Sequence, residues 1–190
     1  MEKILGIDRS LFKLINYRGS NAFFDWLMPW MRNAELWYPL YFFLILLVMA
    51  NYKKRAWLWV LLGVATVFLS NFISSSIIKE YVWRLRPCNN PSFASWIHVL
   101  VGYRPQSSSF TSSHAANHFA MAVYIYITLK PLLGRWGYLF FLWAFLVALA
   151  QVYVGVHYPL DVTAGALIGI LIGYLSGQSY NRTYNLAPPL

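Results

Sequence analysis

The residue types that can carry out chemistry gather in two polar stretches of this chain, and the shorter one holds a histidine and a carboxylate. His157 precedes Asp161 by four residues, a spacing that lets the two side chains meet across one helical turn. Asp161 can then accept the ring N–H of His157, fix its tautomer and leave the other nitrogen nucleophilic. Pro159 suits the first turn of such a helix. The alternative is a carboxylate that only complements the dipole at the helix N-terminus.

The longer polar stretch ends in a run of hydroxyl side chains, residues 109–113, directly before His114 and another apolar segment. These hydroxyls can cap a helix whose first backbone N–H groups are free, and such a helix start favours an anion. They would cap the helix equally well with no anion bound. His114 lies at the mouth of this helix, whereas His118, one turn deeper, fits a structural role and His98 in the loop is uninformative.

Two cations stand at the start of the same stretch. Lys79 and Arg86 are seven residues apart, almost two helical turns, so both can face one spot. Pro87 biases Arg86 out of the helix and ends it there. A lysine at the end of a membrane helix can also be a simple interfacial anchor. Together, however, the cations, helix start, histidines and carboxylate match a phosphate-ester site, in which one histidine attacks and the other protonates the leaving oxygen.

Three motifs in this order resemble those of the type 2 phosphatidic acid phosphatase superfamily, which also contains acid phosphatases and vanadium haloperoxidases. The first, a lysine followed after six residues by Arg-Pro, is present as Lys79 and Arg86-Pro87. The second, usually Pro-Ser-Gly-His, appears as Thr111-Ser112-Ser113-His114. The third, Ser-Arg followed by a histidine and an aspartate, appears as Ala150-Gln151, His157 and Asp161.

This resemblance implies a membrane lipid phosphatase that works through a phosphohistidine. It implies that His157 is the nucleophile, Asp161 its orienting partner and His114 the general acid. The implied phosphate-binding residues are Lys79, Arg86, Ser112, Ser113 and Gln151. Neither a metal nor another cofactor is implied.

Two positions depart from the family pattern. Ser113 replaces a glycine that would let the backbone approach phosphate closely. Gln151 replaces an arginine and removes one full charge from the phosphate clamp, and we expect Arg84 or Arg104, which flank the loop, to compensate. Gln151 also motivates an alternative, a catalytically silent phospholipid-binding or transport protein. A histidine-ligated haem or metal protein fits less well, because His157 already has a carboxylate neighbour.

The composition of the 190 residues places these side chains in a membrane. Hydrophobic residues make up 59% and charged residues 11% of the chain, against roughly 45–50% and about 25% in soluble domains. Six acids against fifteen Lys and Arg exclude an acidic tail and a carboxylate-rich calcium or di-iron site. The one cysteine, Cys88, excludes an intramolecular disulfide and a multi-thiolate zinc site. The basic residues flank apolar runs, which favours a lipid bilayer over a nucleic acid as partner.

Apolar runs long enough to cross a bilayer predict an all-α, polytopic membrane bundle. We expect five transmembrane helices, at residues 36–52, 56–81, 115–129, 136–154 and 160–177. We expect residues 1–190 to form a single lipid phosphatase domain, with a transmembrane core at 36–178 and an active-site loop at 84–113. Charges interrupt residues 1–34 too often for a signal peptide, so this segment predicts amphipathic interfacial helices or a sixth crossing.

Five crossings place both polar stretches on one side of the membrane. On the other side lie the basic residues Lys53, Lys54, Arg55, Lys130, Arg135 and Arg182. The positive-inside rule makes that side cytoplasmic, so we expect a cell (inner) membrane protein with its active site on the outer, periplasmic face.

A pocket at this outer boundary can take a phosphate whose tail stays in lipid. We expect its roof to be formed by Trp96, Val99, Leu100 and Tyr103. The family resemblance suggests a lipid phosphate or pyrophosphate as substrate, with undecaprenyl pyrophosphate first. Phosphatidylglycerol phosphate, phosphatidic acid and the phosphates of lipid A are the alternatives.

Overall fold

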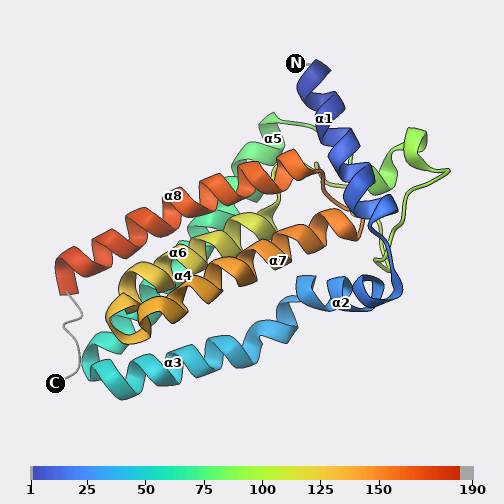
Figure 1. Cartoon of the computed structure of the whole chain (residues 1–190). Coiled ribbons are helices and arrows are strands. Elements are labelled where there is room, and N and C mark those ends of the chain that lie inside the picture. The colour runs from blue at the N-terminus through green and yellow to red at the C-terminus, as the bar shows by residue number, and fades with distance from the viewer. Residues whose placement is uncertain (1, 185–190) are drawn as a thin grey trace.

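The computed structural model describes residues 2–184, and every regular element within them is helical, which confirms the all-α prediction. In these residues eight α-helices, some continued by short 3-10 or π segments, make an elongated bundle (Figure 1). Their bounds are α1 Glu2–Lys13, α2 Ala22–Arg32, α3 Tyr38–Tyr52, α4 Ala56–Asn71, α5 Lys79–Tyr81, α6 Ser113–Leu133, α7 Leu139–Tyr153 and α8 Pro159–Tyr184. The π segment Phe72–Ile78 joins α4 to α5 without a break.

The centre of the bundle is the contact between α6 and α8, which run side by side (Figure 1). The two helices can approach closely because α8 presents a glycine at every fourth position toward α6. These glycines are Gly165, Gly169, Gly173 and Gly177. A Cβ atom at Gly169 would collide with the backbone oxygen of Ala116. At the start of this seam the Ser112 N–H donates to the Asp161 carbonyl oxygen at 3.0 Å, so the two helix starts are joined.

Four helical stretches in the described residues are long and apolar enough to cross a membrane: Ala34–Tyr52, Ala56–Tyr81, Ser113–Tyr153 and Pro159–Thr183. The predicted third and fourth crossings both lie in the 41-residue stretch Ser113–Tyr153. It comprises α6, the 3-10 segment Gly134–Tyr138 and α7, and Figure 1 shows α6 and α7 lying alongside each other. The multi-pass architecture is confirmed, and the count of five crossings stays a prediction.

The N-terminal segment forms α1 and α2, and neither is among the candidate spans found in residues 2–184. On α1, Ile4, Ile7 and Leu11 are exposed, whereas Asp8 and Phe12 are buried against the bundle. An outward apolar face on a terminal helix suits the membrane interface, in agreement with the predicted amphipathic character. Because α1 contacts α8 near its start, this segment reaches the predicted site.

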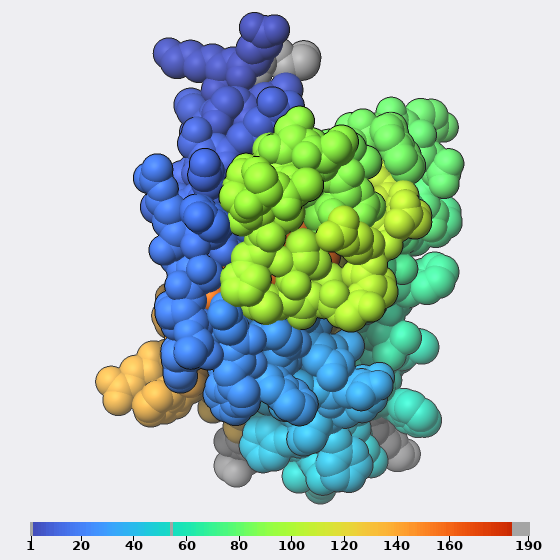
Figure 2. Space-filling model, turned by 90° about the vertical axis from the view of Figure 1, so that its right-hand side faces the viewer, coloured from blue at the N-terminus to red at the C-terminus, as the bar shows by residue number. Residues whose placement is uncertain are grey.

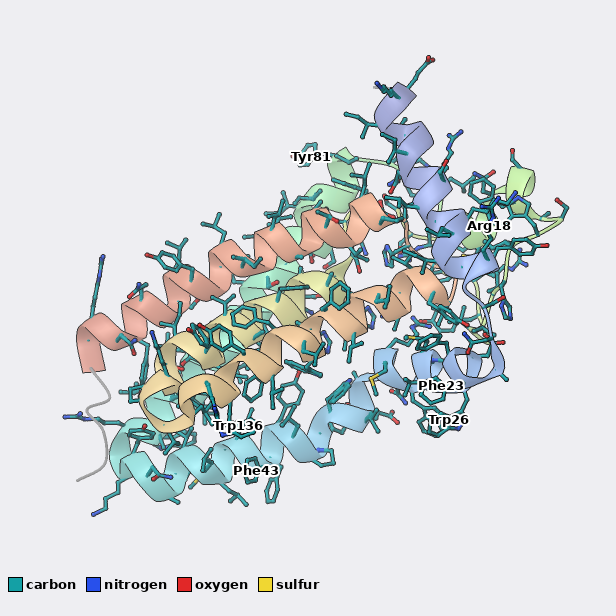
Figure 3. The ribbon with its side chains drawn as sticks, viewed as in Figure 1. Arg18, Phe23, Trp26, Phe43, Tyr81 and Trp136 are labelled. Carbon is teal, nitrogen blue, oxygen red and sulfur yellow. The ribbon has the colours of Figure 1, made fainter. Side chains whose placement is uncertain are left out.

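Large apolar side chains cover the outside of the bundle. Phe43, Tyr81 and Trp136 are each more than half exposed and project from the ribbon in Figure 3. Such an apolar surface matches lipid, and tyrosine and tryptophan favour the interfaces of the bilayer. The interior holds a second aromatic set, in which Trp59 packs against Tyr124 at 5.5 Å between ring centroids.

Candidate active site

Helix ends bring the predicted site residues to one end of the bundle (Figure 1). Lys79 begins α5, His114 lies in the first turn of α6, Gln151 in the last turn of α7 and Asp161 in the first turn of α8. The loop of residues 82–112, green to yellow-green in Figure 2, covers this end beside α1. The two polar stretches therefore lie together, as the sequence predicted.

His157 and Asp161 lie against each other in the interior. The Nδ1 atom of His157 is 3.6 Å from Asp161 Oδ2, and both side chains are buried. The same carboxylate oxygen accepts the Tyr158 N–H at 2.8 Å, so the backbone fixes its position. The separation is slightly longer than a hydrogen bond, as is common in catalytic pairs before substrate binds.

Arg86 fixes the tautomer of His157 from the other side of the ring. Its Nη1 atom is 3.1 Å from His157 Nε2. A guanidinium can only donate, so Nε2 is the unprotonated nitrogen and the Nδ1–H faces Asp161. Burial lowers the pKa of His157 to about 4, and the charges of Arg86 and Lys79 add to this effect while Asp161 opposes it. The imidazole is therefore neutral at pH 7, with its lone pair on Nε2.

Both predicted phosphate-binding cations lie close enough to His157 for their charges to lower its pKa. Arg86 is buried and held by Ser107 and Ser108, whose carbonyl oxygens accept from its Nε at 2.9 Å and its Nη2 at 3.2 Å. Burial lowers the pKa of Arg86, but a guanidinium stays charged at physiological pH. Within residues 2–184 the half-buried Lys79 ammonium has no hydrogen-bond or ion-pair partner, so it is available to an anion.

The start of α6 offers several donors without partners. Ser112 is the N-cap, and its Oγ accepts the Ala115 N–H at 3.4 Å. Ser113 adopts the right-handed helical conformation, so a serine at the family's glycine position is not strained. Among the described residues, the buried hydroxyls of Ser109, Thr111 and Ser113 have no hydrogen-bond partner. Such orphaned groups are rare, and phosphate oxygens at a helix start would satisfy them.

Gln151 shows the same feature at the end of α7. Its side chain is fully buried, and neither amide atom has a hydrogen-bond partner in the part of the chain that the structure describes. The amide is thus free to bind a phosphate oxygen, but it brings no charge.

Of the two arginines expected to compensate for Gln151, Arg84 is engaged by carboxylates and the role of Arg104 stays a prediction. Arg84 Nη1 is 2.6 Å from Asp161 Oδ1, and its Nη2 is 2.5 Å from Asp8 Oδ2. Because two carboxylates occupy its guanidinium, Arg84 orients Asp161 instead of reaching toward phosphate. Arg104 is exposed, and no hydrogen bond or ion pair within residues 2–184 ties its side chain to the site.

Asp8 on α1 belongs to the site, although the sequence pattern did not indicate it. It is buried, its Oδ2 pairs with Arg84, and its Oδ1 accepts the Leu160 N–H at 2.8 Å in the first turn of α8. The available signal for Asp8 was that this carboxylate lies on the side of the helix opposite to its exposed apolar face. The partner of Asp8, Arg84, lies far along the chain, so the sequence could not connect the two.

The remaining histidines lie outside the reacting groups. His118 Nδ1 donates to the His114 carbonyl oxygen at 2.8 Å, and its ring packs edge-on against Trp143, in agreement with a structural role. The Nδ1 atom of His98 lies 3.8 Å from Asp25 Oδ1. In residues 2–184 no three His, Cys, Asp or Glu side chains are grouped so that they could hold a metal ion.

The predicted roof forms only in part. Leu100 and Tyr103 line a cavity of about 350 Å³ that also includes His114. Trp96 instead packs on Phe93 at 4.8 Å between ring centroids, and Val99 belongs to the apolar cluster at the end of α7.

Comparison with known proteins gives consistent results. A model of the PAP2 superfamily matches residues 57–184. Lipid A 4'-phosphatase from Bacteroides thetaiotaomicron is 31% identical over 174 residues, 89% of this chain and 75% of that protein. Undecaprenyl-diphosphatase from Sulfolobus acidocaldarius is also 31% identical, over 88% of this chain and 76% of that protein.

A solved structure supports the fold. The PAP2 type phosphatidylglycerolphosphate phosphatase from Bacillus subtilis has a TM-score of 0.74 and 20% identity, over 98% of this chain and 90% of that chain. The family match spans more than half of the chain and contains all three motifs. This multi-pass membrane protein therefore belongs to the PAP2 superfamily and is a lipid phosphatase.

Proposed function

We propose that the protein hydrolyses its lipid phosphate through a covalent phosphohistidine on His157. The observation that carries this proposal is the Arg86 contact at Nε2, which with Asp161 at Nδ1 leaves a neutral ring with a defined lone pair. That lone pair attacks phosphorus, the bond to the leaving oxygen breaks, and His114 gives this oxygen a proton. Water, deprotonated by His114, then attacks the phosphohistidine and releases inorganic phosphate, with His157 again neutral.

The groups around the ring would stabilise the five-coordinate phosphorus. Arg86 can turn one donor from Nε2 to a phosphate oxygen, which frees the lone pair for attack. Lys79, the Gln151 amide and the hydroxyls at the start of α6 complete the cradle, and fixed donors in a buried site act strongly on developing charge. None of these steps uses a metal ion.

An apolar cavity beside the site suits the lipid tail. Its volume is about 520 Å³, and it lies between α3, α4 and α6, with Leu44, Val64 and Met121 in its lining. Asn117, three residues after His114 on α6, lines the same cavity. A phosphate at His157 could therefore keep its hydrocarbon chain in this groove.

The relatives support two substrate classes. The phosphates of lipid A are the leading candidate, because two lipid A 4'-phosphatases, 31% and 26% identical, match this chain over 89% and 90% of its length. Undecaprenyl pyrophosphate, supported by one relative of 31% identity, comes second. Phosphatidylglycerol phosphate and phosphatidic acid follow. The basic residues at the other end of the bundle, such as Lys130 and Arg135, support an active site on the outer face of a cell membrane.

Phosphate release from a panel of these lipids in detergent, with EDTA present, tests the proposal. We expect release by the wild type, none by His157→Ala, and a phosphate label on the wild-type protein alone. His98→Ala is the matched control, because it removes an imidazole outside the site, and we expect it to keep activity. Turnover by His157→Ala would refute the phosphohistidine, and binding without release of any lipid would favour the silent binding protein.

A further inference from the structure

One cavity next to the site has no role in the mechanism above. It has a volume of about 350 Å³, and its lining includes Pro29, Arg32, Asn33, Tyr103 and His114. His114 is the residue it shares with the predicted catalytic set, since its lining contains neither His157 nor any of the predicted phosphate-binding residues. The space therefore adjoins the proposed general acid. A leaving group that takes its proton from His114 must lie next to that residue.

Arg32, the last residue of α2, provides this cavity with a positive charge. Its Nε atom is buried and has no hydrogen-bond partner among the described residues. Its Nη2 atom is 3.5 Å from the Tyr103 hydroxyl, and the guanidinium lies 5.9 Å from the centre of that ring. No carboxylate in residues 2–184 forms an ion pair with it.

The charge of Arg32 also reaches the reaction centre. Burial is the main cause that lowers the pKa of Arg86, and repulsion by Arg32 contributes to the same shift. An arginine that served only as a membrane anchor would direct its charge toward water or lipid headgroups. Arg32 instead lines a cavity with His114, close enough to Arg86 for the two charges to interact.

We propose that this cavity is a second anion subsite, in which Arg32 binds a negatively charged leaving group, and that the preferred substrate is a lipid diphosphate. This inference rests on the proposed function. His157 Nε2 would attack the terminal phosphorus and break its bond to the bridging oxygen, which takes the electron pair and a proton from His114. The lipid monophosphate so released keeps its phosphoryl group on Arg32. A charge-assisted bond of this kind discriminates between leaving groups with and without a charge.

Farnesyl diphosphate and farnesyl monophosphate provide a matched pair of probes, since they share a tail and differ by one phosphoryl group. We expect Arg32→Ala to lower kcat/KM for the diphosphate by about tenfold or more, the effect of losing one charged hydrogen bond. Its kcat/KM for the monophosphate should stay within about twofold, because that substrate puts no charge on Arg32. Arg32→Lys should keep part of the diphosphate preference. Arg18→Ala, which removes an exposed arginine labelled in Figure 3, should change neither value.

Inhibition gives a readout that does not depend on turnover. Inorganic pyrophosphate should inhibit the wild type more strongly than it inhibits Arg32→Ala, whereas inhibition by inorganic phosphate should be equal in both. An equal loss on both farnesyl substrates, or no loss on either, would overturn the subsite and leave the phosphatase mechanism standing. Failure of the wild type to hydrolyse either substrate would instead count against the proposed function.

Discussion

Removal of the charge on Asp8 tests whether the N-terminal helix takes part in catalysis. Asp8 lies on α1, yet its two carboxylate oxygens contact Arg84 and the Leu160 N–H, next to Asp161. Asp8→Asn keeps a side-chain oxygen that can accept the Leu160 N–H, but it loses the charge that pairs with the Arg84 guanidinium. Arg84 would then be held from the Asp161 side alone, and the Asp161 carboxylate would be less firmly aimed at His157.

The size of the effect follows from the bonds involved. A hydrogen bond to a charged group contributes about 1.5–3 kcal/mol and a neutral one about 0.5–1.5, so the substitution loses about 1–1.5 kcal/mol. If that loss falls on the orientation of Asp161, kcat drops about five- to thirteenfold. KM should hardly change, because Asp8, Arg84 and Asp161 do not contact phosphate in the proposed mechanism.

Steady-state kinetics on a lipid phosphate, with the rate of phosphohistidine formation, would show whether the change falls on kcat or on KM. Asp8→Glu should recover part of kcat, since it restores the charge. Glu2→Gln removes the same charge from an exposed position of the same helix and should have no effect. An unchanged kcat in Asp8→Asn, or a change confined to KM, would show that the ion pair serves only to attach α1.

Four further outcomes follow from the same geometry. The attacking imidazole must be neutral, and burial lowers the pKa of His157 to about 4, so kcat/KM should fall only as the pH drops toward that value. Asp161→Asn should move this acidic limb of the pH profile to a still lower pH. An acidic limb near pH 6.5 in the wild type would contradict the lowered pKa. Vanadate, which resembles the five-coordinate phosphorus, should inhibit competitively while EDTA has no effect, and inhibition by EDTA that a divalent ion reverses would require a metal mechanism. Gln151→Ala should cost less in kcat/KM than Lys79→Ala, because it removes a neutral donor instead of a charge, and the opposite order in the same assay would contradict the assignment. Gly169→Leu should separate α6 from α8 and destabilise the protein by at least about 1–3 kcal/mol, measured by thermal unfolding in detergent; an unchanged unfolding temperature would argue against the close seam.

Local spacing predicted the parts of the site that depend on neighbouring residues. The spacing of four positions from His157 to Asp161 and the hydroxyls before His114 indicated their arrangement, because a helical turn converts such spacings into contacts. The spacing did not indicate that Arg84 pairs with Asp161 and Asp8, or that Asp8 lies beside the site. The position of Asp8 is set by how α1 packs on the start of α8, and no periodicity within one helix reports such packing. The long apolar runs likewise predicted a multi-pass bundle.

The glycine seam between α6 and α8 and the cavity proposed for the lipid tail use different residues. The alignment of the reacting groups and the fit of the tail can therefore change independently. The seam sets the spacing of the helix starts that carry His114 and Asp161, and its contacts involve Ala116 and the glycines of α8. The tail cavity is lined by other positions, on α3, α4 and a different face of α6. Mutations that reshape this cavity for a new hydrocarbon can therefore accumulate while the reacting groups keep their alignment. Such a division would let one scaffold serve lipids with different hydrocarbon tails.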